Sequence, residues 1–369
     1  MSLAFTLFRR FEFSAAHQLS RPGLEGRLHG HNYAAWLGVT GPVRPDSGQI
    51  TPAADLDAIV TSLKQRYDYC RLNQRLSAEP TALNLARAVW KEAGPRMAMP
   101  VQLVSTEIQE EAGEAARFTP TEATQMIYGE FAAAHRTHAP RLSGVENLKL
   151  YGKCNNPAGH GHNYQVELYL PPAAHLPPGL WAEFDHRNLS SDIPDLRGRN
   201  VVTETIAELL ARRVPEARRV RVWETTDFFA EYDPHDSRRP YRLGRRWRFR
   251  AAHNLYQSTL TPEENVRRYG ACAATPEPHG HTYHLEATLA GTLAPETETV
   301  YDLGQLDQLG SDILQELDYT YLDGDEAVFT LENIAQRLWQ RFAERVGPAL
   351  SAVRIGDGPQ QYCVTRLNP

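Results

Sequence analysis

The sequence predicts an α+β protein made of three tandem repeats, each with antiparallel strands and helices. A composite histidine motif occurs three times at equal spacing, and near each copy period-2 apolar runs alternate with apolar stripes at helical spacing. Equal spacing of a composite motif is typical of internal duplication. A chain of 369 residues is long enough for two or three domains. We therefore expect unit 1 over residues 1–122, unit 2 over 123–240 and unit 3 over 241–369.

Each copy of the motif has Ala-Ala-His upstream and His-Gly-His downstream, with a tyrosine one residue further on. The upstream histidines lie 118 residues apart both times. Nine of the 14 histidines belong to the three copies: His17, His29 and His31; His135, His160 and His162; His253, His279 and His281. Chance does not produce such a distribution.

The pattern within a unit predicts two strands, two helices and further strands. Phe11 and Phe13 alternate with polar residues before His17, as in a half-buried strand. Apolar residues at helical spacing predict helices over 56–67 and 83–90 in unit 1, and over 306–317 and 331–339 in unit 3. Only 20 residues separate Tyr164 from Asp185 in unit 2, against 34 in the other units. We expect unit 2 to have lost or shortened its first helix.

Composition excludes several classes of protein. The chain has 39 basic and 45 acidic residues and a net charge of −6, which argues against a polyanion-binding surface and a nucleic-acid partner. No apolar run is long enough to span a membrane. The four cysteines are far apart, as in a reducing compartment. We expect a cytoplasmic protein with free thiols.

The histidine triplets predict metal sites. Residues i and i+2 of a strand project to the same face, so His-Gly-His presents two imidazoles side by side. The third imidazole would come from the neighbouring antiparallel strand. Three imidazoles without a fourth protein ligand are typical of a catalytic zinc site with one open position. Iron or copper could use these ligands, but Zn²⁺ suits an imidazole site without a redox partner.

Two cysteines lie close upstream of a metal motif. Cys154 precedes His160 by six residues, and Cys272 precedes His279 by seven. A thiol near a dication becomes a usable thiolate, so both are candidate catalytic groups, with a buried inert thiol as the alternative. Unit 1 has no cysteine there, and Glu25 occupies the corresponding loop.

A further candidate is the pair Asp185 and His186. An aspartate beside an imidazole can orient it for proton relay. The corresponding strings of units 1 and 3 keep the aspartate, Asp68 or Asp318, and replace the histidine with tyrosine. For these two aspartates, helix capping is the favoured interpretation.

These motifs resemble the superfamily of 6-pyruvoyl-tetrahydropterin synthase and 6-carboxy-tetrahydropterin synthase. The resemblance covers all three units and is most specific in unit 2. It implies the tunnelling fold, an antiparallel four-stranded sheet with two helices, and three tandem repeats of it closing a twelve-stranded barrel. Two such chains would stack as a homodimer of pseudo-trimers. The residues that carry it in unit 2 are the string from Cys154 to Tyr164, the string from Asp185 to Leu189, Thr203-Glu204 and the string from Val222 to Thr225.

The resemblance also implies an activity and a set of site residues. It implies a zinc-dependent lyase that converts 7,8-dihydroneopterin triphosphate to 6-pyruvoyl-tetrahydropterin with elimination of triphosphate. The roles implied for unit 2 are metal ligands (His135, His160, His162), thiolate (Cys154), relay (Asp185, His186), pterin anchor (Glu224) and further substrate contacts (Thr203, Glu204). Asp357 stands near the anchor position in unit 3, and Glu107 is the candidate anchor in unit 1.

Family pockets lie between subunits, so Asp185-His186 could serve a neighbouring unit, such as unit 3 with Cys272. Two alternatives to the lyase stay open: a 6-carboxy-tetrahydropterin synthase that makes a queuosine precursor, and a non-catalytic zinc- and pterin-binding scaffold. The arginine-rich stretch 238–250 is either a basic barrel lumen or a solvated strand face.

Overall fold

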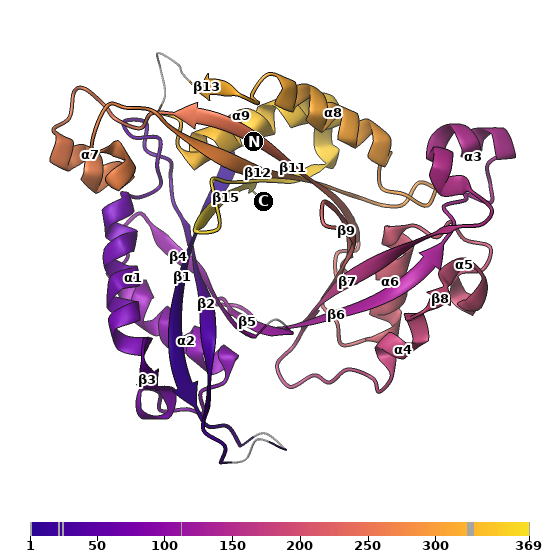
Figure 1. Cartoon of the computed structure of the whole chain (residues 1–369), viewed down its shortest axis with the longest axis horizontal. Helices are drawn as coiled ribbons and strands as arrows, with labels where there is room; N and C mark the ends of the chain where they lie inside the picture. Colours follow the sequence, from indigo (N-terminus) through magenta and orange to yellow (C-terminus); the bar gives the residue numbers. More distant parts are fainter. Residues whose placement is uncertain (1, 21–22, 24–25, 112, 323–327, 369) are drawn as a thin grey trace.

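The chain forms a closed antiparallel barrel. The computed structural model describes residues 2–20, 23, 26–111, 113–322 and 328–368. Twelve long strands of this described part follow one another in the order β10-β9-β7-β6-β5-β4-β2-β1-β15-β14-β12-β11, and β10 pairs with β11 to close the ring. Figure 1 looks into the barrel, with the helices outside it. The twelve-stranded barrel expected from the resemblance is confirmed.

Each unit contributes four consecutive barrel strands. They are β1 (Leu3–His17), β2 (His29–Thr40), β4 (Gln102–Glu111) and β5 (Glu114–Phe118) in unit 1; β6 (Ala123–His135), β7 (His160–Leu170), β9 (Arg219–Thr225) and β10 (Phe228–Tyr232) in unit 2; and β11 (Tyr241–His253), β12 (His279–Gly291), β14 (Leu350–Gly356) and β15 (Gln361–Leu367) in unit 3. The units join through the antiparallel pairs β5–β6, β10–β11 and β15–β1. Closure leaves no unpaired edge on these long strands, which is a physical reason for fusing three units.

Three short strands lie beside the ends of the first strand of each unit. They are β3 (Cys70–Arg71), β8 (Arg187–Asn188) and β13 (Thr320–Leu322), and they pair in parallel with β1, β6 and β11. They follow α1 (Ala53–Tyr67), α4 (Leu180–Phe184) and α8 (Leu303–Gln315), respectively. This arrangement brings Asp185-His186, Asp68-Tyr69 and Asp318-Tyr319 to equivalent positions beside the first strand of their units.

Most of the helices cover the outer face of the barrel. The helices are α1 (Ala53–Tyr67) and α2 (Ala82–Ala93) in unit 1; α3 (Gly144–Tyr151), α4 (Leu180–Phe184), α5 (Leu189–Asp192) and α6 (Thr203–Arg213) in unit 2; and α7 (Pro262–Tyr269), α8 (Leu303–Gln315) and α9 (Leu331–Val346) in unit 3. Of these, α3 and α7 lie at the periphery of the barrel, in the connections from β6 to β7 and from β11 to β12. The helix pairs predicted in units 1 and 3 are confirmed. The shortened first helix of unit 2 is confirmed too, because α4 has 5 residues where α1 has 15 and α8 has 13. None of the helices in the described ranges is long and apolar enough to cross a membrane.

The outer face of each sheet forms the hydrophobic core. Along β1, Phe5, Leu7, Phe11 and Phe13 are buried on the outer face, where Arg9 pairs with Asp57 of α1, and the even-numbered residues between them face the barrel interior. In each unit an aromatic of the first strand stacks on the tyrosine that follows the His-Gly-His motif, as with Phe13 and Tyr33 at 5.0 Å between ring centroids. The pair fixes the strand register beside the histidines.

A large and a small residue exchange places between units 2 and 3. Gly129 on β6 leaves room for Trp181 of α4, because a Cβ at Gly129 would lie 2.2 Å from the Trp181 ring. The equivalent strand position in unit 3 is Trp247, six residues before His253, and it packs against Gly310 of α8. The same interlayer space is thus filled from opposite sides.

Candidate metal centres

Each histidine triplet converges on one point at the end of a hairpin. The strand register pairs His17 with His29, His135 with His160 and His253 with His279, and the i+2 histidine of each second strand shares the same face. The Nε2 atoms of His17 and His29 lie 3.0 Å apart, as do those of His253 and His279. In each group the ligand atoms all lie within 4.8 Å of one another. The three trios predicted from sequence are assembled in the structure.

A backbone carbonyl orients the first histidine of each trio. The Nδ1 atoms of His17, His135 and His253 lie 2.9, 2.8 and 2.9 Å from the carbonyl oxygens of Pro80, Val201 and Phe329. Because an oxygen there accepts the Nδ1 proton, the Nε2 lone pair is left for the centre. These carbonyls come shortly before α2, α6 and α9, so the last helix of each unit positions its metal ligand.

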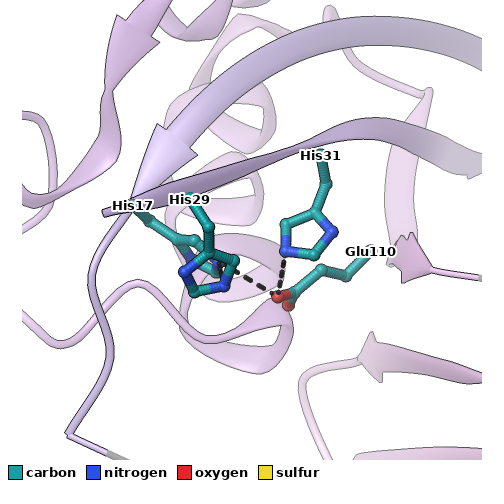
Figure 2. Close-up of side chains that lie close together, drawn as sticks. All are labelled: His17, His29, His31 and Glu110. Atoms are coloured by element: carbon teal, nitrogen blue, oxygen red, sulfur yellow. Dashed lines mark hydrogen bonds and ion pairs between the residues drawn. The ribbon is translucent and has the colours of Figure 1, made fainter. Parts of the chain in front are cut away.

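An acidic residue stands beside the trio in two units. Glu110 Oε1 lies 3.3 Å from the Nε2 atoms of both His17 and His31 (Figure 2). In unit 2, Glu224 Oε1 lies 3.5 Å from His162 Nε2. Both carboxylates belong to the groups of potential metal ligands, whereas in unit 3 that group has only the three histidines.

The strand register shows why sequence reasoning missed Glu110. Ala34, Gln165 and His284 each lie five residues after the first histidine of their His-Gly-His motif, and their cross-strand partners are Gln109, Trp223 and Gly356. The residue after each partner is Glu110, Glu224 or Asp357. These three acids are therefore equivalent, and the expectation for Asp357 agrees with this register.

Glu107 does not lie at the metal centre. It pairs with Trp36 and Arg117, and its charged neighbours are Arg117, Arg354 and Arg219 inside the barrel. The strand pairing therefore puts Glu110, and not the candidate Glu107, at the position equivalent to Glu224.

The residues fit a bound dication. Among the described residues, the buried Nε2 atoms of His135 and His162 have no hydrogen-bond partner. Burial lowers the pKa of His160 and His162, and it lowers the pKa of His253 to about 4. Neutral imidazoles with free Nε2 lone pairs are the form that binds a metal. Three such nitrogens, with or without a carboxylate, suit Zn²⁺.

A buried glutamate sits behind the trio in units 2 and 3. Glu204 and Glu332 follow the carbonyls of Val201 and Phe329 by three residues and are 2% and 3% exposed. Burial raises the pKa of both carboxyl groups to about 7. Sequence reasoning assigned Glu204 and missed Glu332, although the spacing in Thr330-Leu331-Glu332-Asn333 could have found it. In unit 1 the equivalent residue is Leu83.

These glutamates show which unit faces each pocket. Glu204 accepts a hydrogen bond from the backbone N–H of Val300 at 3.1 Å, so the unit 2 pocket is bounded by unit 3. Glu332 accepts one from the N–H of Ile50 at 3.0 Å, so the unit 3 pocket is bounded by unit 1. A cavity of about 60 Å³ at the second junction is lined by His253, Glu332 and Asp357, and by Gln49, Thr51 and Leu56 of unit 1.

The remaining assigned groups of unit 2 gather around Glu224. Thr203 Oγ1 donates to Glu224 Oε2 at 2.5 Å. Burial and the charge of Glu224 raise the pKa of the half-buried Cys154 thiol, while Lys153 lowers it. Thiolate at neutral pH therefore depends on a positive charge beyond that of Lys153, such as a bound dication.

Unit 3 repeats this arrangement with Cys272. Burial raises the pKa of this thiol, and the charge of Asp357 raises it further. Each cysteine thus lies near the acid of its own unit. Glu25, the residue in the corresponding loop of unit 1, lies outside the described residues.

Asp185 and His186 form a pair away from the trio. Asp185 Oδ2 lies 2.8 Å from His186 Nδ1, and Asp185 Oδ1 accepts from the N–H of Ala132 at 2.9 Å. His186 has a positive φ of 56°, and its side chain is 83% exposed. It lines an open groove of about 520 Å³ with Gly161, His162 and Asn163. In the described part of the chain, no hydrogen bond or ion pair joins the pair to unit 3.

The aspartate has the same structural role in every unit. Asp68 and Asp318 accept from the N–H groups of Ser14 and Arg250 at 2.8 and 2.7 Å, as Asp185 does from Ala132. These bonds fix the turn to the first strand. Asp68 is also the C-cap residue of α1, as expected, whereas the C-cap of α8 is Glu316 and not Asp318. Only unit 2 has an imidazole at the exposed position that follows this aspartate. Tyr69 occupies the position in unit 1 and Tyr319 occupies it in unit 3.

Comparison with known proteins identifies the repeated unit. The family model described as 6-pyruvoyl tetrahydropterin synthase matches residues 6–121, 127–235 and 242–368. The 6-pyruvoyl tetrahydrobiopterin synthase of Poecilia reticulata is 35% identical over 116 residues, which are 26% of this chain and 79% of that protein. The human enzyme of the same name is 34% identical over 123 residues, 28% of this chain and 85% of that protein.

The chain is also similar to a relative with another product in its name and to a solved structure. A putative 6-carboxy-5,6,7,8-tetrahydropterin synthase of Archaeoglobus fulgidus is 30% identical over 80 residues, 22% of this chain and 68% of that protein. The solved 6-pyruvoyl tetrahydropterin synthase of Caenorhabditis elegans aligns with a TM-score of 0.30 and 28% identity, covering 33% of this chain and 92% of that chain. Since the family model matches all three units, the chain belongs to the 6-pyruvoyl tetrahydropterin synthase family.

Proposed function

We propose that the chain is a zinc-dependent lyase that converts 7,8-dihydroneopterin triphosphate to 6-pyruvoyl-tetrahydropterin and eliminates triphosphate. The family makes it an enzyme of the 6-pyruvoyl tetrahydropterin synthase type. The observation that carries the proposal is the cluster in unit 2, where three imidazoles, Glu224 and the nearby Cys154 meet at one hairpin end.

The pockets of units 2 and 3 support the proposal better than that of unit 1. Units 2 and 3 each have a metal trio, a cysteine beside an acid, and a buried glutamate facing the next unit. In unit 1 the glutamate is replaced by Leu83, and the loop has no cysteine. We therefore assign the chemistry to the pockets of units 2 and 3.

A dication held by His135, His160 and His162 would act as a Lewis acid toward side-chain hydroxyls of the substrate. The carboxylates of Glu224 and Glu204 suit the neighbouring N–H groups of a pterin ring, which present paired donors. Thr203 holds Glu224 in place through its hydroxyl. Cys154 is the group placed to take and return a side-chain proton.

The exposed Asp185-His186 pair supports a contribution from a second copy of the chain. Asp185 orients the imidazole, and the side chain of His186 is left open to solvent. A homodimer of pseudo-trimeric chains would allow this imidazole to complete a pocket of the other copy. Comparing the molar mass in solution of H186A with that of the natural sequence tests the assembly. Loss of turnover in H186A with the bound metal retained tests the role of His186 as a relay.

Product analysis tests the proposed reaction. The purified protein is incubated with 7,8-dihydroneopterin triphosphate, and the pterin products are identified by mass while released triphosphate is counted. Release of one triphosphate for each 6-pyruvoyl-tetrahydropterin, reduced in H135A and abolished in the double variant H135A/H253A, supports the proposal. A 6-carboxy product favours the second branch, to which the Archaeoglobus relative points by name. Pterin binding without triphosphate release indicates a scaffold and contradicts the lyase.

A further inference from the structure

The inner face of unit 3 carries a group of basic side chains that the metal centres do not use. Arg246 and Arg248 alternate with Trp247 and Phe249 along β11. Trp247 and Phe249 are buried on the outer face, where Trp247 packs on Gly310 of α8. The two arginines therefore project to the barrel interior. The arginine-rich stretch, for which two interpretations were open, contributes to a basic lumen at these positions.

The strand register brings two more basic groups beside them. Arg248 is directly opposite His284 on β12, and Arg246 is opposite Glu286. Glu286 is in turn opposite Arg354 on β14. A cavity of about 320 Å³ is lined by all five side chains and by Asp227, from the β9–β10 turn of unit 2.

The charges in this cavity are not balanced. Arg246 donates from Nε to Glu286 Oε2 at 2.7 Å, which neutralises both groups. Among the described residues, Arg248 and Arg354 have no hydrogen bond or ion pair from their guanidinium groups, although Arg354 lies 3.6 Å from the centroid of the Tyr362 ring. Asp227 is the remaining acid of the lining, and the charges of Glu107 and Glu286 also act on Arg354. Burial and the charges of the three arginines lower the pKa of His284, which reports a positive potential there.

The other two units provide an internal comparison. Counting from the histidine motifs and across the strand pairs, the five equivalent positions are Arg10, Glu12, Ala34, Trp36 and Glu107 in unit 1, and Tyr128, Glu130, Gln165, Glu167 and Arg221 in unit 2. Each of these sets has one basic and two acidic side chains, whereas unit 3 has three arginines and one glutamate. The basic cavity is thus specific to unit 3 and is not a consequence of the repeated fold.

We propose that Arg248, Arg354 and His284 form a binding site for a multivalent oxyanion of the inorganic phosphate class. Unpaired guanidinium groups present forks of N–H donors that match the oxygens of phosphate. The partly enclosed barrel wall screens the charges less than bulk water does. The site lies on the inner face, opposite to the face that carries His253, His279 and His281, and it does not depend on the reaction proposed above.

Isothermal titration of the full chain with inorganic triphosphate tests the site, with sulfate as a probe that does not chelate metals. We expect one saturable site per chain that weakens as ionic strength rises. R248Q and R354Q should each raise the dissociation constant at least tenfold. R10Q changes an inward-facing arginine at the position in unit 1 that corresponds to Arg246, and it should leave the constant within twofold.

A conservative variant and a competing anion complete the test. R248K retains the positive charge without the forked N–H donors of a guanidinium group. It should bind triphosphate more weakly than the natural sequence but more tightly than R248Q. An unchanged melting temperature shows that each variant folds. Citrate should compete poorly, since its carboxylates are spaced differently from linked phosphates. Absence of saturable binding, equal affinity in R248Q, equal loss in R10Q, or competition by citrate as strong as by triphosphate would overturn the proposal.

Discussion

Glu204 of unit 2 accepts a hydrogen bond from the backbone N–H of Val300 in unit 3, at 3.1 Å. The carboxyl group is 2% exposed, so a side chain placed behind one metal centre also fixes a loop of the next unit. Glu332 and Ile50 repeat the contact between units 3 and 1. Leu83 stands at this position in unit 1 and offers no acceptor, so two of the three junctions have this bond.

Glu204 and Glu332 should make stability depend on pH. Burial raises the pKa of both to about 7, above the ordinary value of 4.5. The folded state therefore binds protons more tightly than the unfolded state, and the stability present at about pH 4 is lost as pH rises through about 7. We expect the melting temperature of the double variant E204Q/E332Q to fall less between pH 5 and pH 8 than that of the natural sequence.

The exposed Glu344 is the matched control for this measurement, since E344Q should leave the pH profile unchanged. An E204Q/E332Q profile parallel to that of the natural sequence would show that these carboxyl groups do not titrate in this range.

Glu298 should stabilise the junction between units 2 and 3. Its carboxylate accepts from Arg199 Nε at 2.8 Å and from the backbone N–H of Asn200 at 2.6 Å. Removing it leaves a partly buried donor without a partner, so we expect E298A to lose about 1–3 kcal/mol of unfolding free energy. Hydrogen exchange at the Asn200 amide should accelerate in E298A and stay unchanged in E296A, which removes an exposed neighbour. Equal exchange in both variants would contradict the assignment.

Gly310 should be intolerant of a methyl group. A Cβ there would lie 2.3 Å from the Trp247 ring, which forces the indole or the helix to move. We expect G310A to lose about 1–3 kcal/mol in chemical denaturation, as overpacked cores do. G144A is the control, because the helical Gly144 has no heavy atom within 4 Å of its Cβ position. If G310A were as stable as G144A, Trp247 would not pack as described.

The acids beside the cysteines should slow alkylation of the thiols. The charge of Glu224 raises the pKa of Cys154, and that of Asp357 raises the pKa of Cys272. In the presence of a chelator at pH 8, E224Q should speed the iodoacetamide reaction of Cys154, because removing the negative charge lowers the pKa of the thiol. D357N should do the same for Cys272.

Peptide mass spectrometry follows both thiols in one sample, so each variant controls the other. E224Q should leave Cys272 unchanged and D357N should leave Cys154 unchanged. A rate change at the wrong cysteine, or at neither, would show that the two acids do not act on the thiols of their own units.

The sequence predicted what depends on local pattern. Strand alternation before His17 and the equal spacing of the motifs were enough to place the trios and the helices. The shortened helix of unit 2 followed from the spacing before Asp185. These features rest on periodicity and turn chemistry within about thirty residues, which sequence displays directly.

What the sequence did not predict depends on pairing between distant strands. Glu107 was the candidate anchor and Glu110 was not considered, because the register of β4 against β2 cannot be counted along the chain. The contact of Glu332 with Ile50 joins residues 282 positions apart. The basic cavity needs β11, β12 and β14 side by side, so the role of the arginine-rich stretch could not be chosen from its alternation alone.

Metal analysis by unit tests the central claim most directly. The natural sequence, purified without added metal or chelator and analysed by plasma mass spectrometry, should contain about three dications per chain, with zinc as the main element. H17A, H135A and H253A should each lose one equivalent and keep the other two, because each histidine serves one trio. A chain with no stoichiometric transition metal, or a single histidine variant that loses all of it, would contradict the account.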